Sequence, residues 1–344
     1  MEAQQTWLRE APGPASVGQV MAEFEEMAAD GTLAAFRPMP TGFMPLDEIL
    51  NGGLRPGELM VLGGPYGVGK TILGLQIARN VARDQEDVKA LYVCYEHDRT
   101  HLLSRLICLE SADQGNGKDS LTLRKLSQLT FSPIEASGLI STLRRDHRYA
   151  GLMEAIDGYA DRLVLARASG AHTDLVEIER WVEDLLTDNT SQLLLVVDYL
   201  QKVPVRREIR DDEAEVTTFL THGLKELALA KGIQVIAIAA ADRQGLRGQR
   251  MRLSDLRGSS ALQYETDVGL VLNNKYDIVS REHLIYNLSD AEAMRNWLVL
   301  TVEKNRAGRA AVDMEYALDA RHFRILPEGN FVRERLIDGK TVLE

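Results

Sequence analysis

Short apolar runs alternate with amphipathic helical patterns along most of the chain. The runs that predict strands lie at 59–63, 89–95, 193–198, 233–241, 268–273, 297–303 and 313–318. Helical periodicity is found at 70–84, from residue 98 and at 213–231. Almost continuous apolar strands that alternate with helices are typical of a parallel sheet covered on both faces. The pattern therefore predicts an α/β fold with a mostly parallel central sheet.

A separate amphipathic helix is expected at residues 16–30, ahead of the first strand. Its apolar residues recur at the spacing of one helical face, Ser16 and Gln19 form a capping box, and Gly31 is a natural C-terminal stop. The Pro-containing stretch at 36–42 separates this helix from the core. Its apolar stripe must pack either on its own domain or on a neighbouring subunit.

The remaining pattern suggests how the chain divides. Residues from about 111 to 170 carry several short helical patterns and the polar stretch DQGNGKDS, which predict a helical insertion that could carry a protein-partner site. We expect an N-terminal arm at 1–36 that serves oligomerisation, a core domain at 37–327 and a C-terminal tail at 328–344.

Composition narrows the class of protein. Hydrophobic residues make up 45% and charged residues 26%, as in a soluble globular protein. The chain has no targeting pattern and no apolar run long enough to span a bilayer, so we expect a cytoplasmic protein without a membrane partner. Two cysteines in apolar surroundings predict neither a disulfide nor a zinc site. His97 and His101 are four residues apart without an evident third ligand, and we expect them on an exposed helix face.

A glycine-rich turn follows the first predicted strand. Gly64, Gly69, Lys70 and Thr71 satisfy G-x-x-x-x-G-K-[ST], with a strand before the motif and a helix after it. Glycines let backbone N–H groups surround a phosphate, and the helix N-terminus adds partial positive charge. Lys70 would reach the outer phosphates of ATP, and the Thr71 hydroxyl would bind Mg²⁺. The residues expected to bind the nucleotide are Gly64, Pro65, Tyr66, Gly67, Val68, Gly69, Lys70, Thr71 and Ile72.

Two carboxylates lie at the ends of predicted strands. Asp198 ends the buried run LLLVVD, where a nucleotide site requires a carboxylate for Mg²⁺. Glu96 follows the run KALYVCY, and ligands of open α/β sheets bind at the carboxyl ends of strands. We expect Asp198 to be a metal ligand and Glu96 to position the attacking water.

A basic segment stands out in a chain whose net charge of −11 argues against general affinity for nucleic acid. Residues 243–257 hold five arginines and one acid, which favours a local polyanion site over an ordinary solvated loop. The arginines are Arg243, Arg247, Arg250, Arg252 and Arg257. A second basic stretch at 205–210 could face a central channel or serve as a solvated connector.

Taken in order, these motifs resemble a RecA-type P-loop ATPase core, most closely the DnaB-type replicative helicase family. TGFMPLDEILNGGLRPGEL (41–59), VCYEHDRTHLLSRLIC (93–108) and VVDYLQ (196–201) are similar to that family's lead-in, glutamate and magnesium motifs. LSDLRGSSALQYETD (253–267) resembles the segment leading out of its DNA-facing loop, which adds Gly258 to the expected nucleic-acid residues. The resemblance covers roughly residues 41–325.

The resemblance also implies an assembly. EKNRAG (303–308) is similar to the motif that sends a lysine and an arginine into the neighbouring nucleotide site, here Lys304 and Arg306. The helix at 16–30 resembles the family's linker helix, which docks on the adjacent subunit. The implied protein is a ring, expected to be hexameric, that hydrolyses ATP and translocates on single-stranded DNA.

Some features favour a different relative. Ala240 stands where the family has a nucleotide-sensing glutamine, and GGPYGVGKT and KNRAG look more like KaiC or RadA proteins. About 36 residues precede the core, where DnaB-type helicases carry a folded primase-binding domain. The alternative is therefore a KaiC- or RadA-like assembly or regulatory ATPase that acts on a protein partner.

Overall fold

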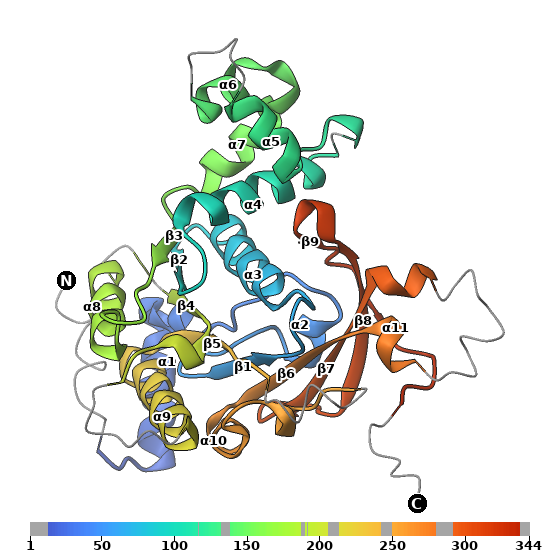
Figure 1. Cartoon of the computed structure of the whole chain (residues 1–344). Coiled ribbons are helices and arrows are strands. Elements are labelled where there is room, and N and C mark those ends of the chain that lie inside the picture. The colour runs from blue at the N-terminus through green and yellow to red at the C-terminus, as the bar shows by residue number, and fades with distance from the viewer. Residues whose placement is uncertain are drawn as a thin grey trace, which may run out of the picture.

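A mixed β-sheet forms the centre of the molecule (Figure 1). The computed structural model describes residues 13–115, 117–131, 138–186, 190, 192–205, 213–241, 250–279 and 292–337. The strands run in the order β10-β8-β7-β6-β1-β5-β4-β2-β3, and β9 pairs with β8. Their bounds are β1 Leu59–Gly63, β2 Val88–Cys94, β3 Leu163–Arg167, β4 Gln192–Asp198, β5 Gln234–Ile238, β6 Val268–Asn274, β7 Trp297–Asn305, β8 Val312–Asp319, β9 Arg324–Ile325 and β10 Asn330–Phe331.

The six strands that lie side by side as β6-β1-β5-β4-β2-β3 are parallel. The pairs β6–β7 and β7–β8 at the other end of the sheet are antiparallel. Register aligns Cys94 with Asp198 and Asp198 with Ile238, while Leu62 also pairs with Ile238. The strands β1, β2, β4 and β5 therefore end at one edge of the sheet, which we call the carboxyl edge. Every segment that follows these strands leaves from this edge.

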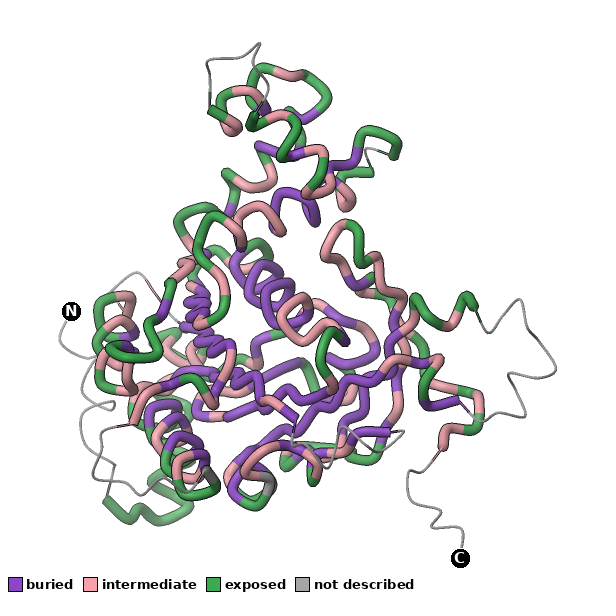
Figure 2. The backbone as a smooth tube through the Cα atoms, viewed as in Figure 1, coloured by how far each residue is buried: buried purple, intermediate pink, exposed green. Residues whose placement is uncertain are grey.

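Helices cover both faces of the sheet, as the apolar runs predict. Their bounds are α1 Val17–Asp30, α2 Leu46–Ile49, α3 Lys70–Asp84, α4 Arg99–Asp113, α5 Leu123–Thr130, α6 Leu139–Arg145, α7 Ala150–Tyr159, α8 Leu175–Leu185, α9 Glu213–Lys231, α10 Ser259–Glu265 and α11 Lys275–Ile278. Residues of α3 pack with Met60, Tyr92 and Val196 on one face, and residues of α8 and α9 pack with Val61 and Leu195 on the other. Figure 2 shows the strands buried between these layers. The predicted α/β fold is confirmed. Among the described residues, no helix combines the length and apolar character needed to cross a membrane.

A helical lobe of α5, α6 and α7 packs on the distal half of α4, beyond the sheet (Figure 1). Buried Arg79 of α3 forms ion pairs with Glu110 and Asp113 of α4, which tie the helix under this lobe to the core. The expected insertion at 111–170 needs a correction at its end. Residues 163–167 form β3, which pairs in parallel with β2 and is therefore part of the sheet.

The N-terminal helix α1 has the ends that its sequence predicts. Ser16 and Gln19 form a reciprocal capping box, and Gly31 ends the helix with a left-handed φ of 83°. None of its residues is buried, and Val17, Met21 and Phe24 are at least half exposed. Its apolar stripe therefore has no cover within the described part of the chain.

The antiparallel end of the sheet includes residues expected in the C-terminal tail. Asn330 and Phe331 form β10 and pair with Glu315 and Met314 of β8. Lys275 forms ion pairs with Glu315 and Glu334. The segment from 328 to 334 is thus built into the sheet rather than a detached tail.

Candidate nucleotide site

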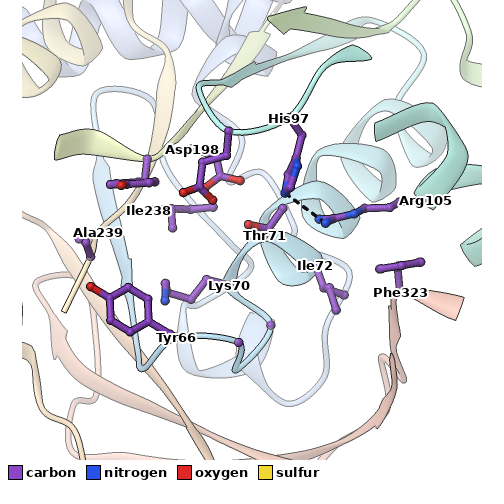
Figure 3. Close-up of a pocket in the computed structure, with 15 residues that line it drawn as sticks. Tyr66, Lys70, Thr71, Ile72, His97, Arg105, Asp198, Ile238, Ala239 and Phe323 are labelled. Atoms are coloured by element: carbon purple, nitrogen blue, oxygen red, sulfur yellow. Dashed lines mark hydrogen bonds between the residues drawn. The ribbon is translucent and has the colours of Figure 1, made fainter. Parts of the chain in front are cut away.

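An open pocket of about 280 Å³ lies at the carboxyl edge of the sheet (Figure 3). The turn after β1 forms its floor, and the ends of β2, β4 and β5 supply its walls. Its lining comprises Tyr66, Gly67, Gly69, Lys70, Thr71, Ile72, Glu96, His97, Arg105, Asp198, Tyr199, Ile238, Ala239, Ala240 and Phe323. The strand register thus brings the predicted phosphate loop, Glu96 and Asp198 together, although they are far apart in sequence.

Glycine is required at several points of the turn. Gly64, Gly67 and Gly69 have φ angles of 149°, 73° and 109°, which residues with a Cβ rarely adopt. A Cβ on Gly64 would also lie 2.6 Å from the carbonyl oxygen of Leu272. Gly69 is the N-cap of α3, so the first backbone N–H groups of this 15-residue helix face the pocket side of the turn. The turn therefore has the backbone form that a phosphate cradle needs.

Lys70 is held within this turn. Its ammonium donates to the carbonyl oxygens of Gly64 at 2.8 Å and Pro65 at 2.9 Å. Burial lowers the pKa of Lys70 to about 8, against the opposing charges of Asp198 and Glu96. Gly64, Pro65 and Val68 do not line the pocket: the first two contribute carbonyls to Lys70, and Val68 is buried. Their predicted nucleotide contacts would have to come from the backbone.

The donors expected for Mg²⁺ are adjacent. Asp198 is buried, accepts a 2.8 Å hydrogen bond from the Tyr92 hydroxyl and is hydrogen-bonded by the Thr71 side chain. Burial raises the pKa of Asp198, and those hydrogen bonds and Lys70 oppose the shift. A buried carboxylate beside a hydroxyl is a set of hard oxygen donors whose charge a cation would stabilise. These residues therefore fit Mg²⁺.

Glu96 lines the same pocket as the phosphate loop and is exposed. It follows β2 directly, and Asp98 then caps α4 by accepting from the His101 backbone N–H at 2.8 Å. The cap fixes where α4 begins and so places the short link that carries Glu96. An exposed carboxylate in this position can accept a proton from a water molecule between it and a bound triphosphate.

One wall of the pocket consists of residues that the sequence reasoning did not assign to the site. Arg105 of α4 and Phe323 line the pocket, and Figure 3 shows them on the side away from Lys70. His97 and His101 were expected on an exposed helix face, which is wrong. Both are partly buried and both are hydrogen-bonded to Arg105. The spacing of four residues between 97, 101 and 105 was the available signal, although His97 precedes the N-cap of α4 and lies outside the helix.

Lys304 and Arg306 lie far from this pocket in their own chain. Lys304 pairs with Gly269, the second residue of β6, and the Arg306 N–H donates to the carbonyl of Asp267, just before β6 at the amino edge of the parallel strands. Its ammonium donates to the carbonyls of Gln263 and Tyr264, and Arg306 forms an ion pair with Asp267 at 3.2 Å. Because strands rise about 3.3 Å per residue, the length of β1 separates the two edges by roughly 15 Å. Neither cation can serve its own phosphate loop without a large rearrangement.

The basic segment is only partly available to a polyanion. Arg250 is buried and bonds to Asp313 and Thr301, which contradicts its predicted exposure to DNA. Arg252 is half-buried against Glu303 at 3.2 Å. A net basic stretch in sequence thus loses much of its charge to acids that β7 and β8 bring alongside it. Arg243 and Arg247 lie outside the described residues.

Arg257 and Gly258 adjoin the end of β5. The Arg257 N–H donates to the Ala240 carbonyl at 3.1 Å. Gly258 has a left-handed φ of 73°, and a Cβ there would lie 2.4 Å from Thr217. Gly258 therefore has a packing reason to be glycine, independent of DNA.

Gln201 connects the pocket to that segment. Its side-chain oxygen accepts from the Ala240 N–H at 3.0 Å, and its amide donates to the Arg257 carbonyl at 3.3 Å. Ala240 lines the pocket, whereas Arg257 is the last residue of the basic segment. The magnesium motif and the basic segment are therefore joined through one side chain.

Comparisons with known proteins agree with this arrangement. Residues 38–324 match the family model described as DnaB-like helicase C terminal domain. The replicative DNA helicase DnaB of Leifsonia xyli subsp. xyli is 26% identical over 72% of this chain and 48% of its own. That of Mycoplasma pneumoniae is 25% identical over 83% of this chain and 56% of its own. The chain thus spans about half the length of these relatives.

Two solved structures share the fold. One, described as the ATPase domain of G40P, has a TM-score of 0.70 at 18% identity and covers 91% of this chain and 99% of that one. The other is a DnaB-like replicative helicase studied with its interactions with primase, with a TM-score of 0.65 at 19% identity, covering 91% and 67%. At these identities the likeness establishes the fold.

Proposed function

Because the chain belongs to the DnaB-like helicase C-terminal domain family, we propose that it is an ATP- and Mg²⁺-dependent motor that assembles as a ring and moves on single-stranded DNA. The membership confirms the family resemblance of the motifs. One observation carries the proposal: the phosphate loop, Asp198 and Glu96 share one pocket, whereas Lys304 and Arg306 lie at the opposite edge of the sheet. A complete site therefore needs two copies of the chain.

Each group has a role that its position supports. The backbone N–H groups of Gly64 and of residues 66–72, together with Lys70, bind the phosphates, and Thr71 and Asp198 hold Mg²⁺. When bound, the cation neutralises charge on the outer phosphates. Glu96 orients water and accepts its proton. ATP binding raises the low pKa of Lys70 again, because the anionic phosphates stabilise its ammonium form.

Lys304 and Arg306 act on the nucleotide of the adjacent subunit. A trans arginine is worth about 10³ to 10⁵ in rate, so hydrolysis depends on assembly. A contact between opposite edges of two copies is heterologous, and such contacts close into rings when the rotation permits. The exposed apolar stripe of α1 offers a second contact for the same neighbour. A hexamer is the proposed closed form, and the predicted cytoplasmic location is part of the proposal.

Single-stranded DNA is proposed to bind the segment that contains Arg243 and Arg247. Arg252, Arg257 and Gly258 flank it on the described side. The link from Ala240 through Gln201 to Arg257 offers a route by which the phosphate state reaches this segment, although Ala240 itself has no side-chain amide. The coupling between ATP hydrolysis and DNA binding would then depend on Gln201.

A second candidate function is supported by Ala240. An alanine in the pocket wall cannot report the terminal phosphate through its side chain, as expected for a KaiC- or RadA-like ATPase that regulates a protein partner. The helical lobe of α5 to α7 stands apart from the sheet and would supply the partner's surface. Its proposed partner is a protein rather than DNA.

ATPase assays with and without single-stranded DNA separate the two functions. The motor predicts stimulation by DNA that weakens at higher salt and is lost in Arg243→Ala/Arg247→Ala. Unstimulated turnover and no salt-sensitive DNA binding would favour the regulatory ATPase.

Glu96→Gln tests the chemical step itself. The variant should bind ATP as the parent does, while turnover falls by about 10² to 10⁴, because the amide cannot accept a proton. Binding measured by fluorescence and phosphate release measured on the same sample check this. Turnover equal to that of the parent would remove Glu96 from the reaction.

A further inference from the structure

Three residues in and just before α4, His97, His101 and Arg105, form a cluster that has no role in the function proposed above. The Arg105 Nε donates to His101 Nε2 at 3.0 Å, and an Arg105 terminal nitrogen lies 3.1 Å from His97 Nε2. The two imidazole rings stack, with centroids 4.6 Å apart and planes 27° from parallel. One guanidinium therefore faces two stacked imidazoles.

The chemistry of arginine decides the protonation of both rings. A guanidinium has five N–H donors and no acceptor, so each imidazole nitrogen facing it must accept. An Nε2 that accepts carries no proton, which leaves both rings neutral with the proton on Nδ1. The arrangement exists only while both histidines are uncharged.

The other side of Arg105 is also fixed. Its guanidinium lies 5.0 Å from the centre of the Phe323 ring, which follows the short helix at Ala320–His322. Arg105, His97 and Phe323 line the same pocket as Lys70 and Thr71. The histidines and Phe323 thus hold a positive charge at the wall of the pocket, as Figure 3 shows for His97, Arg105 and Phe323. A cation there attracts an anionic ligand.

We propose that His97 and His101 are positioning residues that hold Arg105 against the bound triphosphate, so that tight nucleotide binding requires both imidazoles to be unprotonated. The proposal rests on the proposed function of this pocket as the ATP site. Protonation of either ring would remove an acceptor and place a second positive charge beside Arg105. The guanidinium would then leave its place at the pocket wall.

The charges around the rings determine the pH at which this occurs. Burial lowers the pKa of both histidines, Arg105 lowers it further, and Asp98 opposes the shift, as Glu96 also does for His97. Lys70 and Asp198 face His97 across the nucleotide pocket, and Arg167 faces it across a second pocket. Both rings therefore gain a proton at a lower pH than an ordinary histidine does.

The test is the affinity for a ribose-labelled fluorescent ATP analogue with Mg²⁺, measured from pH 5.5 to 8. The chains compared are the parent, His97→Gln/His101→Gln, Arg105→Ala and His147→Gln. Glutamine keeps an acceptor without titrating, and His147 is an exposed histidine of the helical lobe that serves as the matched control. Thermal unfolding at each pH verifies that every chain is folded.

At neutral pH, Arg105→Ala should bind about tenfold or more weakly, because a charge-assisted contact is lost. The parent and His147→Gln should lose affinity steeply at acid pH, and the glutamine pair should lose much less. The terminal phosphate of the nucleotide also takes up a proton in this range, so only differences between chains at one pH are read. A glutamine pair that follows the parent at every pH, or an unchanged affinity in Arg105→Ala, would overturn the inference. A parent that binds no nucleotide at pH 7.5 would instead overturn the proposed function.

Discussion

At the scale of single residues, the phosphate loop shows how backbone geometry and burial set one chemical property. Positive φ angles at Gly64, Gly67 and Gly69 curl the turn so that its carbonyls enclose the Lys70 ammonium. Enclosure removes water from that ammonium and lowers its pKa to about 8. In the absence of a bound anion, Lys70 therefore loses its charge as the pH rises through about 8.

This low pKa predicts proton uptake on ATP binding above pH 8. In the free protein Lys70 loses its proton as the pH rises through about 8, and the bound triphosphate restores the ammonium form. Affinity should therefore fall by up to about tenfold per pH unit above that point. Calorimetry in buffers of different ionisation enthalpy counts the protons. Lys70→Arg, which stays charged, is the control and should show no uptake from this position; equal uptake by both chains would contradict the assignment.

Sequence motifs identify some of these residues and not others. The glycines, Lys70, Thr71, Asp198 and Glu96 belong to contiguous patterns whose chemistry is local, so their place in one pocket can be predicted. Arg105 and its two histidines acquire their role only when α4 starts at Arg99, after its N-cap Asp98, and Phe323 of a distant segment packs beside it. Periodicity groups His97, His101 and Arg105 at helical spacing, but it does not show that His97 precedes α4 or that the pocket lies beside this helix.

At the scale of elements, apolar runs predict the buried strands and the helices between them. The strand β3 is not predicted, because its sequence LVLAR is short and it is an edge strand that pairs only with β2. The partners of Arg250 could not be predicted either. The pairing of β7 with β8 places Asp313 beside Thr301, and both residues are distant from Arg250 in the sequence. A charge pattern read along the sequence cannot reveal acids that arrive from another strand.

Arg250→Ala is accordingly expected to act on stability. It leaves Asp313 without its buried cation, although Thr301 still donates to the carboxylate, and Asp313 is 28% exposed, so the loss should be about 2 to 3 kcal/mol, below the range for fully buried pairs. Denaturant unfolding measures this loss, with Arg247→Ala as the comparison from the same basic segment. If Arg250→Ala unfolds like the parent yet weakens DNA binding as much as Arg247→Ala does, Arg250 reaches DNA and its buried position is not the functional one.

At the scale of the whole molecule, the parallel strands separate the two groups of residues that we propose to form one reaction centre. The pocket opens at the carboxyl edge, and Lys304 and Arg306 lie at the amino edge, near the start of β6. The stripe of Val17, Met21 and Phe24 on α1 adds an uncovered apolar surface outside the sheet. Both features are accounted for if each copy of the chain completes the nucleotide site of its neighbour and covers the apolar stripe of α1.

The central claim is that ATP is hydrolysed between two copies of the chain. The most direct test combines Glu96→Gln, which lacks a working pocket, with Arg306→Ala, which lacks the cation for its neighbour. Each chain alone should be nearly inactive. Mixed assemblies, co-expressed in equal amounts with different tags and purified through both, should recover about a quarter of the parent ATPase rate, because random mixing makes that share of heterologous interfaces join two intact halves. Mixed assemblies no more active than the separate chains, or full activity of Arg306→Ala alone, would contradict the claim.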